Sequence, residues 1–174
     1  MPDNGPAKLA EEGRRAFEKK QFDLAADFFR QAAEGYTLSG AGLLAAEMNN
    51  NLSVSLLQAG NPQDALKAAL GTDQVFAAAN DLKRQAMALG NQAAALEALK
   101  RYKEAIASYE HSAGLFAQAG EGDMQAMVMK SAAALKLKTG KITDSAFKMM
   151  GALEAKQKPT LFERILRFLL RVKR

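Results

Sequence analysis

The feature that most constrains the fold is an internal repeat of 40 residues, in which small side chains recur at two fixed places. The first place holds Ala25, Ala65, Ala105 and Ser145, and the second holds Gly13, Ser53, Ala93 and Ala133. Small residues let two helix backbones approach closely, and larger side chains there would force them apart. A unit of this length buries its apolar face by stacking on its neighbours. The repeat therefore predicts four stacked helix hairpins.

Residues that tolerate a positive φ recur where helices should end. Gly or Asn is the usual residue just after a helix C-terminus, and such residues occur at Gly40, Gly60, Asn80, Gly120 and Gly140. Lys20 and Lys100 occupy the equivalent places in the other hairpins, where we expect a different turn. The pattern predicts helices over residues 7–19, 22–39, 43–59, 62–79, 82–99, 102–119, 122–139 and 142–157, and a last one over 161–173.

The composition favours an all-α fold. Of the 174 residues 48% are hydrophobic and 25% are charged, a balance typical of a globular chain rather than of a disordered one. Ala is abundant and β-branched residues are scarce, which favours helices over strands. We therefore predict an all-α solenoid of four antiparallel helix hairpins, followed by a C-terminal amphipathic helix.

The large and small side chains are spaced as in a known repeat family. In the first helix of a hairpin the large residue comes four positions before the small one, as in Leu9/Gly13, Leu89/Ala93 and Met129/Ala133. In the second helix the small residue comes first, as in Ala25/Phe29, Ala105/Tyr109 and Ser145/Met149. Over about residues 7–158 this spacing resembles the tetratricopeptide repeat, in a longer subtype of 40 residues. The closing proline of the 34-residue form is absent.

The resemblance implies both an organisation and a function. It divides the chain into a flexible N-terminus (1–6), repeats at about 7–40, 41–80, 81–120 and 121–158, and a C-terminal segment (159–174). Proteins of this family usually bind an extended peptide or protein segment on a concave face lined by the first helices. The residues that map to this face are Glu11, Arg14, Glu47, Asn50, Asn51, Val54, Met87, Asn91, Met127, Lys130 and Ser131.

One column of this face holds Asn51, Asn91 and Ser131, one in each successive hairpin. An Asn side chain offers both a donor and an acceptor, so such a column can bind a peptide backbone without reading its sequence. Met87 and Met127 would add an adaptable apolar patch. Alternatively, all of these are ordinary residues of a solvated helix face.

The sequence carries no catalytic motif. Its glycines are spaced as helix terminators and not as a phosphate-binding loop. The chain has no cysteine and a single histidine, which excludes thiol catalysis and multi-His metal sites. We expect His111 to be a solvent-facing helix residue. The chain is therefore predicted not to be an enzyme, and no catalytic, metal-binding or cofactor-binding residue is assigned.

The C-terminal segment concentrates the positive charge. Residues 160–174 hold five basic residues and one acidic residue, whereas the whole chain has a net charge of +5. On a helical projection the arginines lie opposite a broad apolar arc that contains two phenylalanines, and Lys173 alone falls near the boundary of that arc. The residues concerned are Phe162, Arg164, Arg167, Phe168, Arg171, Lys173 and Arg174. Three interpretations stay open: a cap on the fourth repeat, a helix on an anionic membrane surface, or a helix that binds another chain.

The function predicted is a non-enzymatic protein–protein interaction module. The alternative is a peripheral membrane-associated or self-associating scaffold, a homo-oligomer for instance, that acts through the C-terminal helix. Nucleic acid is not a predicted partner, because the basic residues cluster in one segment without stacking aromatics in a groove. The N-terminus has no apolar signal region. Together with the absence of cysteine this favours the cytoplasm, with attachment to a membrane surface as the alternative.

Overall fold

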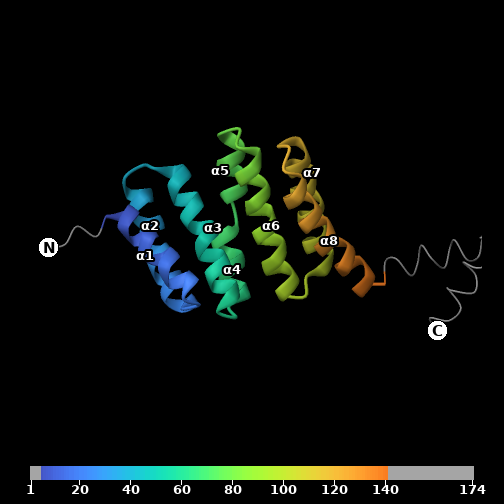
Figure 1. The fold of residues 1–174 in the computed structure, drawn as a ribbon, viewed down its shortest axis with the longest axis horizontal. Helices are drawn as coiled ribbons and strands as arrows, with labels where there is room; N and C mark the ends of the chain where they lie inside the picture. Colours follow the sequence, from blue (N-terminus) through green and yellow to red (C-terminus); the bar gives the residue numbers. More distant parts are fainter. Residues whose placement is uncertain (1–4, 141–174) are drawn as a thin grey trace, which may run out of the picture. The chain divides into compact units, whose positions relative to one another are not determined.

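The computed structural model describes residues 5–140, which are all-α. Within this range no strand occurs, as the composition predicts. The helices are α1 (Pro6–Glu18), α2 (Phe22–Leu38), α3 (Gly42–Gln58), α4 (Pro62–Ala69), α5 (Thr72–Ala78), α6 (Leu82–Ala98), α7 (Tyr102–Gln118) and α8 (Gly122–Lys138). Helices that follow one another in the chain pack together from α1 to α4 and from α5 to α7, and α6 also packs on α3 and α4 (Figure 1). None of the described helices is long and apolar enough to cross a membrane.

The chain divides into two compact units, residues 1–132 and 133–174. The first unit holds α1 to α7 and the beginning of α8. In the second unit the described residues are those up to Gly140, where Thr139 donates a hydrogen bond to the Leu135 carbonyl (2.9 Å) at the end of α8. The helices predicted over 142–157 and 161–173 lie outside the described residues.

A left-handed residue follows the helices at intervals of 20 positions. The residue after it donates its N–H to a carbonyl five positions earlier, as from Gln21 to Ala16 (2.9 Å), which is the Schellman arrangement. The expectation of a different turn at Lys20 and Lys100 is wrong. These lysines have φ of 59° and 61°, close to the 56° of Asn80, so the same backbone turn is imposed on residues that do not favour it.

The predicted helix over 62–79 is wrong as a single element, because the structure breaks it into α4 and α5. Gly71 adopts φ of 82° at the break, a conformation that a residue with a Cβ rarely accepts. The break interrupts the helical hydrogen bonds and leaves the Ala69 carbonyl without its helical donor. Thr72 Oγ1 (2.7 Å) and Gln92 Nε2 (3.1 Å) bind that carbonyl instead.

The small residues of the repeat lie in the core, where helices approach most closely. Ala25, Ala65 and Ala105 are fully buried. A Cβ placed on Gly13 would lie 2.8 Å from Cε1 of Phe29, so only glycine lets α2 pack this closely on α1. Phe76, on α5, is fully buried as well.

Candidate functional site: a hollow between α1 and α3

A hollow of about 370 Å³ opens between helices α1 and α3. Arg14, Phe17 and Glu18 line it from α1, Phe29 from α2, and Glu47, Asn51 and Val54 from α3. We call it the α1–α3 hollow. Four of its residues belong to the face that the resemblance to the tetratricopeptide repeat implies for peptide binding: Arg14, Glu47, Asn51 and Val54. The hollow is therefore a place where the structure brings predicted site residues together.

Three residues of the α1–α3 hollow were not predicted as site residues. The sequence pattern gives Phe29 only as the large partner of Ala25, and the side chain is 2% exposed. Phe17 and Glu18 lie one helical turn after Arg14, so the i, i+3 and i, i+4 spacing could have found them. The two aromatic rings give the hollow an apolar lining, while Glu18 is exposed.

Arg14 and Glu11 form an ion pair with each other. Arg14 donates to Glu11 Oε2 from Nε (3.2 Å) and Nη2 (2.9 Å), and Arg15 lies 3.2 Å from the other carboxylate oxygen. The hydrogen bond from Arg14 lowers the pKa of Glu11 below its ordinary value. The positive charge of Arg14 is thus largely balanced before any ligand arrives.

Glu47 joins the α1–α3 hollow to the next hairpin. Its carboxylate lies 3.3 Å from Arg84 on α6, and Arg84 Nε lies 2.7 Å from Asp81 Oδ2. Asp81 also caps α6 by accepting the backbone N–H of Arg84 (2.9 Å), and this bond is the main reason why its pKa is lowered. The Arg84 guanidinium lies 5.1 Å from the centre of the Phe76 ring. Glu47 therefore belongs to a fixed network.

The structure overturns the assignment of Asn50 to the binding face. Asn50 is 8% exposed, and its Oδ1 lies 2.9 Å from the hydroxyl oxygen of Thr72. Thr72 and Gln92 in turn bind the Ala69 carbonyl at the helix break, and Gln92 also donates to Asp73 (2.9 Å). Asn50 is a buried support of the break between α4 and α5, because its position in the repeat places it toward α5 rather than toward solvent.

The other predicted residues of the face divide into two groups. Asn51 and Asn91 are half-buried, and neither side chain has a hydrogen-bond partner among residues 5–140. Met87, Met127 and Lys130 are exposed. Ser131 differs from its column partners, because its hydroxyl donates to the Met127 carbonyl (3.4 Å) and also interacts with Tyr109. Burial, and then the nearby Glu97 carboxylate, raises the pKa of Tyr109.

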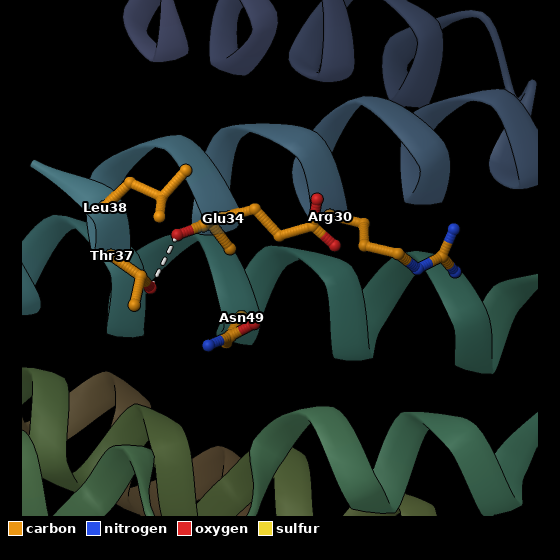
Figure 2. Close-up of a pocket in the computed structure, with 6 residues that line it drawn as sticks. Arg30, Glu34, Thr37, Leu38 and Asn49 are labelled. Carbon is orange, nitrogen blue, oxygen red and sulfur yellow. Dashed lines mark hydrogen bonds between the residues drawn. The ribbon is translucent and has the colours of Figure 1, made fainter.

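A second hollow, of about 430 Å³, lies between α2 and α3 (Figure 2). Asn49 lines it from α3, where the equivalent residues of other repeats are Leu9, Leu89 and Met129. Arg30, Ala33, Glu34, Thr37 and Leu38 line it from α2. Thr37 donates to the Ala33 carbonyl (2.8 Å), and Leu38 is 89% exposed. We call it the α2–α3 hollow; none of its residues was predicted to bind a ligand.

The predicted membrane or partner residues, from Phe162 to Arg174, lie outside the described residues. Among the residues that the structure does describe, no group of three or more acidic, His or Cys side chains could hold a metal ion. His111 is exposed on α7, as expected. A comparison with models of known protein families finds no match for the chain, and a comparison with curated proteins finds no similar sequence. The resemblance to the tetratricopeptide repeat thus depends on the spacing of the residues alone.

Proposed function

We propose that the chain is a solenoid similar to the tetratricopeptide repeat, and that it binds an extended protein segment along the face of its first helices α1, α3, α6 and α8 without catalysing a reaction. One observation carries this proposal: Asn51 and Asn91 are equivalent residues of two packed helices, and neither amide has a hydrogen-bond partner within residues 5–140. An Asn carboxamide can donate to a peptide carbonyl and accept from a peptide N–H at the same time.

The α1–α3 hollow supports the same face. It lies beside Asn51, so a segment that bonds to Asn51 can place a side chain in it. The exposed Met87 and Met127 follow on α6 and α8, and flexible thioether side chains adapt to different partners. Hydrogen bonds to the backbone with one side-chain pocket beside them suit an extended segment better than a folded domain.

The test is selection of binders from a displayed library of short protein segments on the full-length chain. We expect selected segments to bind the double variant Asn51→Ala, Asn91→Ala more weakly by about 1–3 kcal/mol, because each lost hydrogen bond contributes roughly 0.5–1.5 kcal/mol. Helical content should be kept, because Ala is the better helix former.

The matched control is the double variant Asn49→Ala, Asn61→Ala, which removes two amides outside the Asn51 column. It should bind the same segments with unchanged affinity. Selected segments that bind both double variants equally well would show that the face of the first helices is not the binding surface.

A further inference from the structure

Each of the two hollows is lined by one exposed glutamate, and the hollows differ in whether aromatic rings lie beside it. Glu18 at the α1–α3 hollow and Glu34 at the α2–α3 hollow are both exposed, and neither has an ion-pair partner among residues 5–140. In Figure 2 the Glu34 side chain extends along α2 toward Arg30, with no aromatic ring among the residues drawn. Glu18 instead shares its hollow with the rings of Phe17 and Phe29. Of these two hollows, the α1–α3 hollow alone combines such a carboxylate with aromatic side chains.

The charges around the α1–α3 hollow are negative on balance. Arg14 and Arg15 are together balanced by Glu11 and Glu12. Arg84 is shared between Asp81 and Glu47, which leaves one negative charge on that network. Glu18 adds a second negative charge, and no counter-ion within the described residues balances it. A cation that enters here gains attraction on both sides of the hollow.

An arginine side chain matches this combination. Its guanidinium is planar and weakly hydrated, stacks on aromatic faces and binds carboxylates. Its donors can also bond to the amide oxygen of Asn51, which lines the same hollow. The volume of about 370 Å³ is at the lower end of ligand pockets, so it suits a single long side chain.

We propose that the α1–α3 hollow is an anchor site for an arginine side chain of the bound segment, held between the Glu18 and Glu47 carboxylates against Phe17. This proposal rests on the proposed function, and it names the side chain that the binding face selects. It also predicts that segments selected by display are rich in arginine at one fixed position.

The experiment follows valine methyl signals of the full-length chain by NMR while N-acetyl-arginine amide is added. The chain has only four valines: Val54, Val75, Val128 and Val172. Val54 lines the hollow, whereas Val75 lies on α5 and reports effects elsewhere. We expect Val54 to shift in a saturable way and Val75 to stay in place. N-acetyl-citrulline amide, which has the same shape without the charge, should bind at least about threefold more weakly.

Two variants locate the site. Glu18→Gln should weaken the binding of N-acetyl-arginine amide about threefold, as expected for an exposed carboxylate. Glu34→Gln is the matched control, because it changes the corresponding carboxylate of the α2–α3 hollow and should leave the affinity unchanged. Both side chains are exposed, so neither change endangers the fold. Phe17→Leu should weaken binding about two- to fivefold through the loss of the aromatic face.

Three results would overturn the arginine anchor: equal binding of the citrulline amide, stronger shifts of Val54 with N-acetyl-leucine amide, or equal effects of Glu18→Gln and Glu34→Gln. If displayed segments still depend on Asn51 and Asn91 while the arginine amide leaves Val54 unmoved, the anchor alone is wrong. If no displayed segment depends on them either, the proposed function is wrong as well.

Discussion

The Phe29 ring packs so closely on Gly13 that a Cβ at position 13 would lie 2.8 Å from Cε1 of the ring. Phe29 is nearly fully buried and lines the α1–α3 hollow. The absence of a side chain at position 13 therefore fixes both the packing of α1 on α2 and the shape of the candidate site.

Replacing Gly13 with Ala should lower the free energy of unfolding by about 1 kcal/mol. The methyl group gains roughly 1 kcal/mol of helix propensity, but overpacking costs about 1–3 kcal/mol and outweighs it. Gly114→Ala is the control, because a Cβ there meets nothing within 4 Å, and it should stabilise the chain. Urea denaturation measures both changes. A stabilising Gly13→Ala would mean that Phe29 moves without cost.

The second prediction concerns the polar network at the helix break. Thr72→Val keeps the shape of the side chain but removes the hydroxyl that lies 2.9 Å from Asn50 Oδ1 and 2.7 Å from the Ala69 carbonyl. Buried polar groups that lose a partner cost about 1–3 kcal/mol, and we expect a destabilisation of this size. Thr37→Val is the control, because Thr37 is exposed, and it should change stability by less than about 0.5 kcal/mol. Equal melting temperatures of the two variants would contradict a structural role for the network.

The third prediction follows from the left-handed backbone at Lys100. With φ of 61°, a residue that carries a Cβ is held in a conformation costing roughly 1–2 kcal/mol. Lys100→Gly should therefore stabilise the chain by about 1 kcal/mol. Lys103→Gly, inside α7, should destabilise it by a similar amount through helix propensity. Thermal unfolding of both variants distinguishes the two effects, and a destabilising Lys100→Gly would contradict the turn geometry.

The helices could largely be predicted because two independent signals agree: the small residues mark the contacts, and the left-handed residues mark the ends. The break after Ala69 could not be predicted from the sequence, because an isolated glycine inside a helical pattern is compatible with a continuous helix. The break depends on tertiary contacts and not on the local sequence. Asn50 and Gln92, far from the break in sequence, supply the partners that make it stable.

The sequence predicts which residues share the face of the candidate site, but it does not predict how the charged residues on that face pair. The repeat places Arg14, Glu47 and Asn51 on one face, because equivalent positions of a repeat face the same way. The sequence spacing does not show which charged side chains form ion pairs and which stay available to a ligand. Arg14 and Arg15 are placed to pair with Glu18 as well as with Glu11, and the structure shows that they pair with the glutamates on their N-terminal side. That choice leaves Glu18 available to a ligand.

The fourth prediction is a pH effect at Asp81. Its pKa is lowered below the ordinary 3.8, chiefly by the backbone hydrogen bond from Arg84. A group with a lowered folded pKa contributes stability above its unfolded pKa and loses it as the pH falls through the folded pKa. Below about pH 4 the chain should therefore lose stability. Asp81→Asn keeps a good helix cap but removes the charge, so its unfolding free energy should fall less steeply with acid.

The control for this prediction is Asp64→Asn, because Asp64 is an exposed residue that pairs with Lys67 at the surface. Its acid dependence should follow that of the unmodified chain. Urea denaturation at a series of pH values between about 3 and 7 measures the slopes. Identical slopes for Asp81→Asn and Asp64→Asn would contradict the role assigned to Asp81.

The fifth prediction tests the basic amphipathic segment, which lies outside the described residues. If residues 160–174 bind a membrane surface, the full-length chain should float with anionic liposomes and not with neutral ones. Each Lys or Arg near an anionic surface contributes about 1 kcal/mol, so the five basic residues make binding measurable. High salt should weaken this binding by screening, and Phe162→Ser with Phe168→Ser should weaken it at any salt.

A capping role predicts different behaviour of the same segment. The chain would then ignore both kinds of liposome, and deletion of residues 160–174 would lower the melting temperature and cause aggregation, because an apolar flank would be exposed. An oligomer contact predicts a smaller but still soluble particle after the deletion, measured by light scattering. Indifference to anionic liposomes at low salt would exclude the membrane interpretation, since the attraction of five basic side chains is strongest under that condition.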